Sequence, residues 1–100
     1  MIYTLKFIQA AKLDVQEAWV WYEEKQSGLG DDFILSIETI VTEITRNPLL
    51  FARKFNDLHI APLRRFPYKV IYAVEESEII VIAVFHTSRN PTLWQERADD

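Results

Sequence analysis

Residues 68–85 read Y-K-V-I-Y-A-V-E-E-S-E-I-I-V-I-A-V-F, and this stretch decides the fold of the chain. The apolar residues follow a period of two, which predicts a strand over Tyr68–Glu75. Glu76 and Ser77 are expected to form a turn. The next segment, Glu78–Phe85, is apolar at nearly every position, so we expect a central strand that is covered on both faces. Together the two strands predict an antiparallel hairpin within a small sheet.

The segments before this hairpin contain one short strand and two helices. Ile2–Ile8 alternates with a period of two and predicts the strand. Apolar residues then recur at helical spacing over 10–26, and again from about Asp31 until Asn47-Pro48 ends the second helix. The join at 27–30 is short and Gly28 suits a left-handed helix cap, so the two helices are expected to form an antiparallel hairpin.

Several polar residues of these segments receive specific expectations. Asp31 or Asp32 should cap the free amide groups at the start of the second helix. Glu23 is expected to be solvated. Trp21 lies off the apolar stripe of the first helix, and either contacts a partner or covers the seam between the helices.

The remaining segments complete an α+β layout. A strand over Leu58–Arg64 is expected at a sheet edge because it contains Pro62, and Thr92–Arg97 is expected to be one closing helical turn. The order of strand, helix, helix and three strands places the helical hairpin on one face of a small, mostly antiparallel sheet. The length of 100 residues predicts a single domain over 1–100.

The second face of this sheet has no assigned cover. The central strand is apolar on that side too, and an uncovered apolar face in a soluble monomer marks an interaction surface. We therefore expect a docking groove for a segment of a partner. Alternatively, the C-terminal turn around Leu93 and Trp94 covers this face.

Composition excludes several classes of site. The chain has no cysteine and only two histidines, His59 and His86, so disulfides and a structural zinc site are excluded, and no metal or other cofactor is expected. His59 is expected to face solvent. No segment approaches the roughly 18 apolar residues of a membrane span. The N-terminal residues lack the pattern of a signal peptide, so a cytoplasmic location is expected.

Charge is distributed unevenly along the chain. The net charge is −4, but residues 1–45 carry three basic and eight acidic groups, whereas residues 46–98 carry eight basic and five acidic groups. A polyanion or an acidic partner could therefore bind the second half. The chain shows no basic recognition helix, so direct DNA binding is not expected.

Three stretches resemble the RelE/ParE family of toxins. A-W-V-W-Y-E-E-K-Q-S-G-L-G-D-D-F at 18–33 resembles the first helix, glycine joint and second helix of that family, and I-T-R-N-P at 44–48 resembles the end of the second helix. Between Arg64 and Arg97, the segments R-R-F-P-Y-K-V-I-Y, I-I-V-I-A-V-F-H-T-S-R-N-P and W-Q-E-R resemble the C-terminal sheet. The resemblance covers nearly the whole chain in the same order.

The resemblance implies the toxin of a type II toxin–antitoxin system, which arrests growth until a cognate antitoxin neutralises it. RelE-like members cut messenger RNA on the ribosome, whereas ParE-like members bind and poison DNA gyrase, and the fold alone does not choose between them. A third alternative is a non-toxic module that binds only the antitoxin. A segment of the antitoxin is expected to pair with a sheet edge or to fill the apolar groove. DNA binding would then come only through the antitoxin.

Two departures from the ribonuclease members favour the ParE-like alternative. Some of those members carry a tyrosine close to the C-terminus, whereas the nearest aromatic residue here is Trp94, and an indole can stack on a base but cannot transfer a proton from oxygen. The chain is also net acidic, with only Lys54 and Lys69 as lysines in its second half, whereas a protein docked on the ribosome meets dense phosphate.

Each alternative implies its own set of site residues. For a ribonuclease, Arg65 would stabilise charge on the scissile phosphate, His86 would transfer a proton, and Arg89 would bind phosphate. Otherwise His86 is expected to fix the strand end through a bond to a loop carbonyl, and Arg64 and Arg65 are expected to point to opposite faces of their strand. For a protein that acts by contact alone, the expected contacts to the target or antitoxin are Arg64, Arg65, Lys69, Arg89, Trp94 and Arg97.

Overall fold

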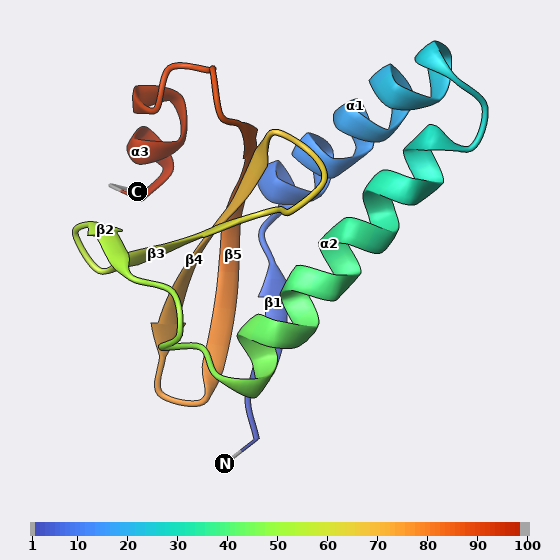
Figure 1. Ribbon diagram of the computed structural model, residues 1–100. Helices are drawn as coiled ribbons and strands as arrows, with labels where there is room; N and C mark the ends of the chain where they lie inside the picture. The colour runs from blue at the N-terminus through green and yellow to red at the C-terminus, as the bar shows by residue number, and fades with distance from the viewer. Residues whose placement is uncertain (1, 99–100) are drawn as a thin grey trace.

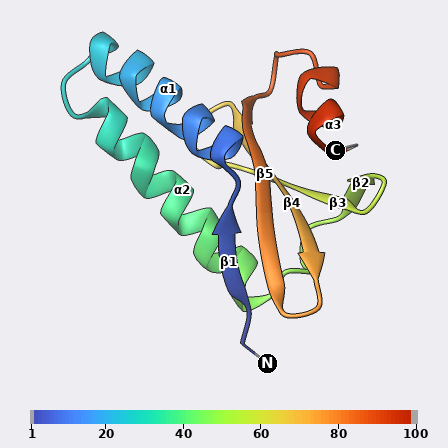
Figure 2. The same cartoon turned by 180° about the vertical axis from the view of Figure 1, so that it is seen from behind.

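A five-stranded sheet with a helical hairpin on one face and a short helix on the other forms the fold (Figures 1 and 2). The computed structural model describes residues 2–98, so Met1, Asp99 and Asp100 lie outside the described residues. The elements in chain order are β1 (Thr4–Phe7), α1 (Gln9–Lys25), α2 (Leu29–Arg46), β2 (Arg53–Phe55), β3 (Leu58–Pro62), β4 (Tyr68–Glu75), β5 (Glu78–His86) and α3 (Thr92–Ala98).

The strands lie in the order β1-β5-β4-β3-β2. The meander β3-β4-β5 is antiparallel, as predicted, and β1 adds in parallel to the outer side of β5. The predicted α+β class is therefore confirmed. The short strand β2 was not expected, and it makes β3 an interior strand. β2 pairs only with Leu58 and His59, so it does not extend as far as Pro62. The β2 side of β3 is therefore open at Pro62, where a proline without an amide hydrogen is tolerated.

A β-bulge interrupts β5. Ile71 pairs with Ala83 and Tyr72 pairs with Val81, so Ile82 has no partner on β4. The bulge places two consecutive residues, Ile82 and Ala83, in the same apolar cluster on the α3 side of the sheet. Before the bulge the odd-numbered residues of β5, such as Val81, face the helices, and after it the even-numbered residues, such as Val84, do so.

The larger core lies between the helical hairpin and the sheet. Tyr22 of α1 stacks on Phe33 of α2 with ring centroids 5.4 Å apart, and Phe66 packs edge-on against both rings. Such aromatic packing buries large apolar areas. The other helical residues buried in this core are Ala11, Ala18, Ile37, Ile40 and Ile44.

The joint between the helices is held by a carboxylate that the sequence analysis placed in solvent. Glu23 accepts hydrogen bonds from the backbone amides of Gly28 and Gly30, both at 2.9 Å, and so performs the capping expected of Asp31 or Asp32. Asp31 instead accepts a bond from the Trp19 indole at 3.0 Å. The prediction for Gly28 is confirmed, since its φ is +90°. The capping prediction was wrong because Glu23, in the last turn of α1, reaches across the short join.

The short helix α3 covers part of the second face. Trp94 is 2% exposed and packs in a cluster with Leu58, Ile71, Ile82 and other apolar residues. The expectation of a fully open face is therefore wrong, and the alternative cover by the C-terminal segment is what the structure has. An open groove of about 570 Å³ remains beside α3, lined by apolar residues that include Ala73 and Ile80.

His59 is buried rather than solvated. It is 5% exposed, its ring stacks on Tyr72 at 5.0 Å, and its Nδ1 lies 2.6 Å from the carbonyl oxygen of Phe51. The Tyr72 hydroxyl donates to the carbonyl of Pro48 at 2.6 Å, and burial raises the pKa of Tyr72 to about 12. These two rings fasten the α2–β2 loop to the sheet. The prediction failed because this loop and β2 cover the middle of β3.

Candidate functional site

The end of the sheet beside α1 forms a groove, which we call the α1–β5 groove. Cross-strand pairing sets Tyr68 opposite His86 on the helix-covered face, with their rings 5.2 Å apart. Trp21 of α1 forms part of the opposite wall. The groove encloses about 640 Å³, within the usual range of ligand sites. Its lining residues are Asp14, Glu17, Ala18, Trp21, Tyr22, Pro67, Tyr68, Val84, His86, Ser88 and Arg89.

His86 fixes the loop that follows β5, but through an amide rather than the expected carbonyl. The backbone N–H of Ser88 donates to His86 Nδ1 at 3.0 Å, and Ser88 Oγ lies 2.8 Å from the same nitrogen. An amide can only donate, so Nδ1 carries no proton in this arrangement and the neutral ring has its proton on Nε2. Only Nε2 is left to face the groove.

Arg89 lies at the rim of the α1–β5 groove. Its guanidinium stands 4.5 Å from the centre of the Phe85 ring. Among residues 2–98, no carboxylate lies within ion-pair distance of it. Burial and the nearby Tyr22 raise the pKa of Tyr68, whereas the positive charge of Arg89 lowers it. Tyr68 is therefore a neutral hydroxyl near pH 7, beside an arginine whose charge is not neutralised within the described part of the chain.

Arg64 and Arg65 line a different groove, over α2. β3 ends at Pro62, two residues earlier than predicted, so both arginines lie in the bend before β4 and not on a strand. Arg64 bonds Glu43 at 2.5 Å and Arg65 lies 3.8 Å from Asp32. The expectation that they point to opposite faces is wrong, because both reach carboxylates of α2. This α2 groove encloses about 240 Å³.

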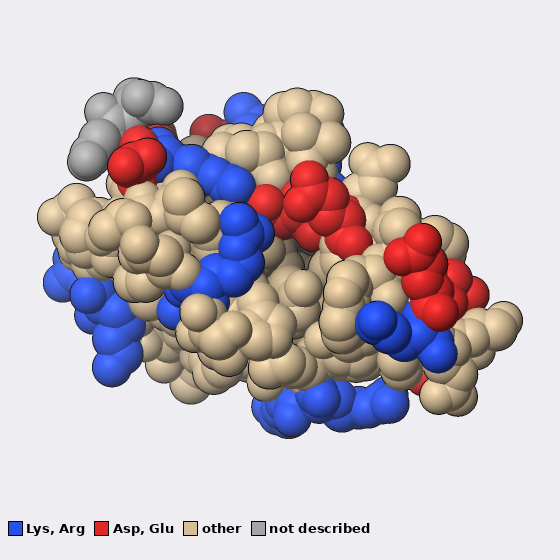
Figure 3. All heavy atoms as spheres, turned by 90° about the horizontal axis from the view of Figure 1, so that it is seen from above, with Lys and Arg blue, Asp and Glu red and all other residues tan. Residues whose placement is uncertain are grey.

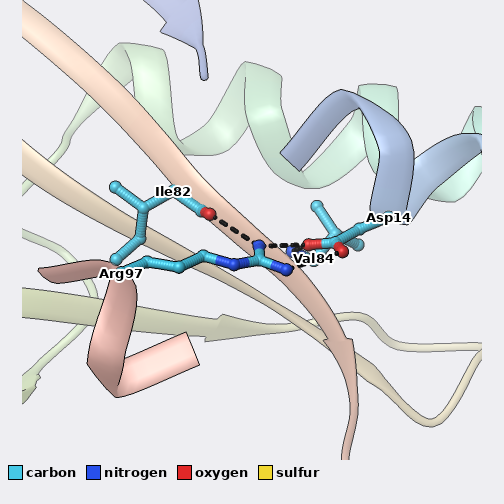
Figure 4. Close-up of polar contacts among 4 residues, drawn as sticks. All are labelled: Asp14, Ile82, Val84 and Arg97. Atoms are coloured by element: carbon cyan, nitrogen blue, oxygen red, sulfur yellow. Dashed lines mark hydrogen bonds and ion pairs between the residues drawn. The ribbon is translucent and has the colours of Figure 1, made fainter. Parts of the chain in front are cut away.

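Arg97 is held in a partly buried ion pair. It bonds both carboxylate oxygens of Asp14, at 2.7 and 3.0 Å, and donates to the carbonyl of Ile82 at 2.9 Å (Figure 4). Asp14 also accepts the backbone amide of Val84 at 3.0 Å. β1 pairs with β5 only as far as Val81. The two side chains therefore satisfy the backbone of β5 where β1 no longer does.

The other two expected contact residues are Trp94, on α3, and Lys69, on β4. Trp94 is buried, and the ammonium group of Lys69 stands 5.7 Å from the centre of its ring. The described structure thus gives Trp94 and Arg97 packing roles within the fold. It brings His86 and Arg89 together, but leaves Arg65 in the α2 groove.

Three residues of the α1–β5 groove were not singled out from the sequence: Asp14, Glu17 and Tyr68. Asp14 could not be recognised, because its partner Arg97 is 83 residues away. Figure 3 looks down on this end of the molecule and shows a central group of acidic side chains bordered by basic ones. Within residues 2–98, no three His, Asp or Glu side chains gather as a metal site would require. None of the helices there is long and apolar enough to cross a membrane.

Comparison with known proteins gives a family and a fold. The family model described as the ParE toxin of the type II toxin–antitoxin system parDE matches residues 5–91. No curated protein matches the sequence.

Three solved structures share the fold at low sequence identity. A chain of the chromosomal ParDE toxin–antitoxin system from P. aeruginosa has a TM-score of 0.65 and 14% identity, with 85% of this chain and 96% of that chain covered. A chain of the RelBE2 toxin–antitoxin complex from Mycobacterium tuberculosis has a TM-score of 0.59 and 17% identity, covering 86% and 99%. A mutant of the E. coli toxin RelE in the free state has a TM-score of 0.63 and 18% identity, covering 99% and 96%.

Proposed function

Because the chain belongs to the family of ParE toxins of type II toxin–antitoxin systems, we propose that it arrests growth by binding DNA gyrase in the cytoplasm. A cognate antitoxin neutralises it, and any DNA binding by the pair comes from the antitoxin. The chain carries out no chemistry of its own in this proposal.

The separation of Arg65 from His86 and Arg89 carries this proposal. His86 and Arg89 line the α1–β5 groove, whereas Arg65 lines the α2 groove and lies near Asp32. A ribonuclease needs its charge-stabilising arginine and its proton-transfer group around one phosphate. Trp94 adds no acid–base group and is buried. Binding through exposed arginines requires no such convergence.

Exposed arginines supply the contact surface. The side chains of Arg64 and Arg65 are 69% and 63% exposed, and Arg89 is exposed as well. Arginines that hold only solvent-screened partners can exchange them for carboxylates of a protein target at little cost. We assign these three residues to the gyrase contact.

A supercoiling assay with purified gyrase tests the proposal. The chain should inhibit supercoiling, and Arg64→Glu, Arg65→Glu or Arg89→Glu should each weaken inhibition by about tenfold or more, since reversed charges at an interface repel. Arg53→Glu is the matched control, because Arg53 is also 63% exposed and paired with an acidic neighbour, Asp57. Unimpaired supercoiling at saturating wild-type chain would contradict the proposal.

A second candidate is cleavage of messenger RNA on the ribosome, favoured by the shared position of Tyr68, His86 and Arg89 in one groove. Induction of the chain in bacteria separates the two functions when DNA and protein synthesis are followed together. The gyrase proposal expects DNA synthesis to fall first. Arrest of translation within minutes, relieved by His86→Ala, would replace it with the ribonuclease.

A further inference from the structure

We propose that two copies of this chain associate through the outer edge of β1, so that their sheets join across a two-fold axis at Leu5. The proposal concerns only the contact of the chain with a second copy of itself, and it holds whichever target the toxin has. The target contact and this edge use different parts of the sheet. β1 pairs with β5 only as far as Val81, whereas the α1–β5 groove is lined by Val84 and His86, so both grooves of a dimer stay open.

The outer edge of β1 carries backbone groups that no strand of residues 2–98 pairs. β1 is the last strand on its side of the sheet and pairs only with β5, and no ribbon crosses in front of it in Figure 2. The amide of Thr4 points to the β5 side, where it donates to the carbonyl oxygen of Ser77 at 2.8 Å. Successive residues of a strand direct their backbone groups to alternate sides. The residues that direct theirs outward are therefore Tyr3, Leu5 and Phe7. Such an open edge is a template for pairing with another chain.

The sequence of β1 is complementary to itself in one antiparallel register. With Leu5 on the two-fold axis, Leu5 exchanges both of its outward hydrogen bonds with Leu5 of the second copy, and Tyr3 exchanges both with Phe7 of the second copy. The side chains of these three residues are only partly buried against the helix-side core. The register sets Tyr3 against Phe7 and Leu5 against itself, so the pairing buries area that is exposed in the monomer. Cross-strand pairs of aromatic and aliphatic residues stabilise antiparallel strands.

The charges on the other face of β1 favour a second copy as the partner. Lys6 lies 3.7 Å from Glu78 of its own chain, and Glu78 pairs with Thr4 in the β1–β5 register. In the dimer, Lys6 stands opposite Thr4 of the second copy, and Glu78 of that copy is the next residue across the sheet. Two strand spacings, roughly 10 Å between Cα atoms, separate Lys6 from this Glu78, and their long side chains can meet over the small Thr4. Each Lys6 thus lies between two Glu78 carboxylates, one from each copy.

The opposite edge of the sheet does not offer the same pairing. It is formed by β2, which contains the consecutive basic residues Arg53 and Lys54. A two-fold axis at either residue would place that residue directly opposite itself, and like charges in this position are destabilising. Basic residues protect edge strands from pairing in this way. At the β1 edge the axis passes through the apolar Leu5, and the one basic residue of β1, Lys6, already has a carboxylate beside it.

Disulfide cross-linking between surface cysteines tests the register. The chain contains no cysteine, and Thr4 and Lys6 are both exposed, so Thr4→Cys and Lys6→Cys leave the core unchanged. In the dimer, the Cα atoms of residue 4 of one copy and residue 6 of the other are about 4.5 Å apart, which suits a disulfide, whereas two copies of the same residue are roughly 8 Å apart, which does not. An equimolar mixture of the two variants should therefore form the mixed disulfide dimer at least about tenfold faster than either variant dimerises alone. Equal rates in the three samples would overturn the proposal, and so would faster cross-linking of either variant alone.

Analytical ultracentrifugation of the full chain tests the charge contact. The wild type should show a monomer–dimer equilibrium that depends on concentration. Lys6→Glu places a carboxylate between the two Glu78 groups and should raise the Kd of the dimer by about tenfold, because symmetry repeats the repulsion at both ends of the contact. Adding Glu78→Lys to this variant exchanges the two charges and should restore the dimer. Lys12→Glu is the matched control, since Lys12 is also exposed but lies on α1, and it should change Kd by less than about twofold.

Three results of these measurements would overturn the proposal. The first is a wild-type chain that stays monomeric up to its solubility limit. The second is a double variant that dimerises no better than Lys6→Glu alone. The third is a Leu5 amide that becomes protected from hydrogen exchange only when the antitoxin is added, which would assign the edge to that partner. Gyrase inhibition is measured separately, so either proposal can fail alone.

Discussion

The helix-covered face of the sheet and the face under α3 are closed by different means. On the first, α1 and α2 contribute seven buried side chains in one continuous core: Ala11, Ala18, Tyr22, Phe33, Ile37, Ile40 and Ile44. On the second, Trp94 is the one core side chain among residues 92–97 of α3, whose burial is described, and the Arg97–Asp14 ion pair holds the helix in place. A strand that is apolar on both sides thus does not require equal cover. Stability is distributed over many contacts on one face and concentrated in a few on the other.

Truncating one aromatic residue on each face gives the largest expected effects and tests this contrast. Phe33→Ala and Trp94→Ala should each cost about 4 kcal/mol, because both side chains are fully or almost fully buried. Phe33→Ala should lower the stability of the whole domain. Trp94→Ala should release α3 locally, so that its amides exchange hydrogen rapidly while β4 and β5 stay protected. Urea unfolding and amide exchange measure the two responses, and equal loss of protection throughout the Trp94→Ala chain would contradict the contrast.

Removing the carboxylate of the ion pair should have the next largest effect. Asp14→Ala leaves Arg97 partly buried without its partner and leaves the amide of Val84 without an acceptor. Breaking one side of a buried pair costs about 3 kcal/mol or more. Urea unfolding measures the cost, with Glu17→Ala on the same helix as the control. A cost equal to that of the control would mean that Trp94 alone holds α3.

Adding a methyl group at the joint between α1 and α2 should reduce stability by a smaller amount. This change tests the helix-covered face of the sheet. In Gly30→Ala, the new Cβ would lie 2.8 Å from the carbonyl oxygen of Trp19 and 2.9 Å from a carboxylate oxygen of Glu23. The backbone of α1 must shift, at a cost of about 2 kcal/mol. Thermal unfolding should show the loss, and stability equal to the wild type would mean that the hairpin can separate freely.

Tyr72→Phe should give the smallest effect at neutral pH. It removes the hydrogen bond to Pro48, worth about 1 kcal/mol. The pKa of Tyr72 is raised to about 12 in the folded chain from 10.0, so its neutral form favours folding. That contribution is complete below pH 10 and is lost as the pH rises through about 12. The free energy of unfolding, measured from pH 8 to pH 12, should therefore fall less steeply with pH in the variant than in the wild type. Parallel curves for the two proteins would contradict the role of this hydroxyl.

Much of the fold follows from local patterns. The strands Tyr68–Glu75 and Glu78–Phe85, the two helices and the left-handed Gly28 were predicted from periodicity and turn residues. The errors have a common cause. Glu23 and His59 were both assigned to solvent, yet each is held by a segment that folds back over it. Periodicity describes one element at a time and cannot reveal such contacts.

The candidate site was harder to predict for the same reason. His86 ends β5 and Arg89 follows three residues later, so the two residues line the same groove, as their spacing predicted, while their roles stay a prediction. The sequence could not separate Arg65 from that group. Arg65 faces α2 because the chain bends after Pro62, and the sequence pattern does not predict the direction of that bend. Trp94 was expected as a contact residue, but it packs against the second face of the sheet. Which β5 side chains form that face depends on the tertiary structure and not on local sequence pattern.

The bulge at Ile82 shifts the phase of everything that follows it in β5. Ile79 and Val81 belong to the helix-side core, but so does Val84, and His86 lies on that side opposite Tyr68. Deletion of Ile82 would restore strict alternation and would leave His86 on the helix side, opposite Tyr68. An alignment of this chain with a relative that lacks the bulge therefore needs a gap inside an uninterrupted apolar strand, where gaps are normally penalised. Without that gap, residues from opposite faces would be compared as equivalents.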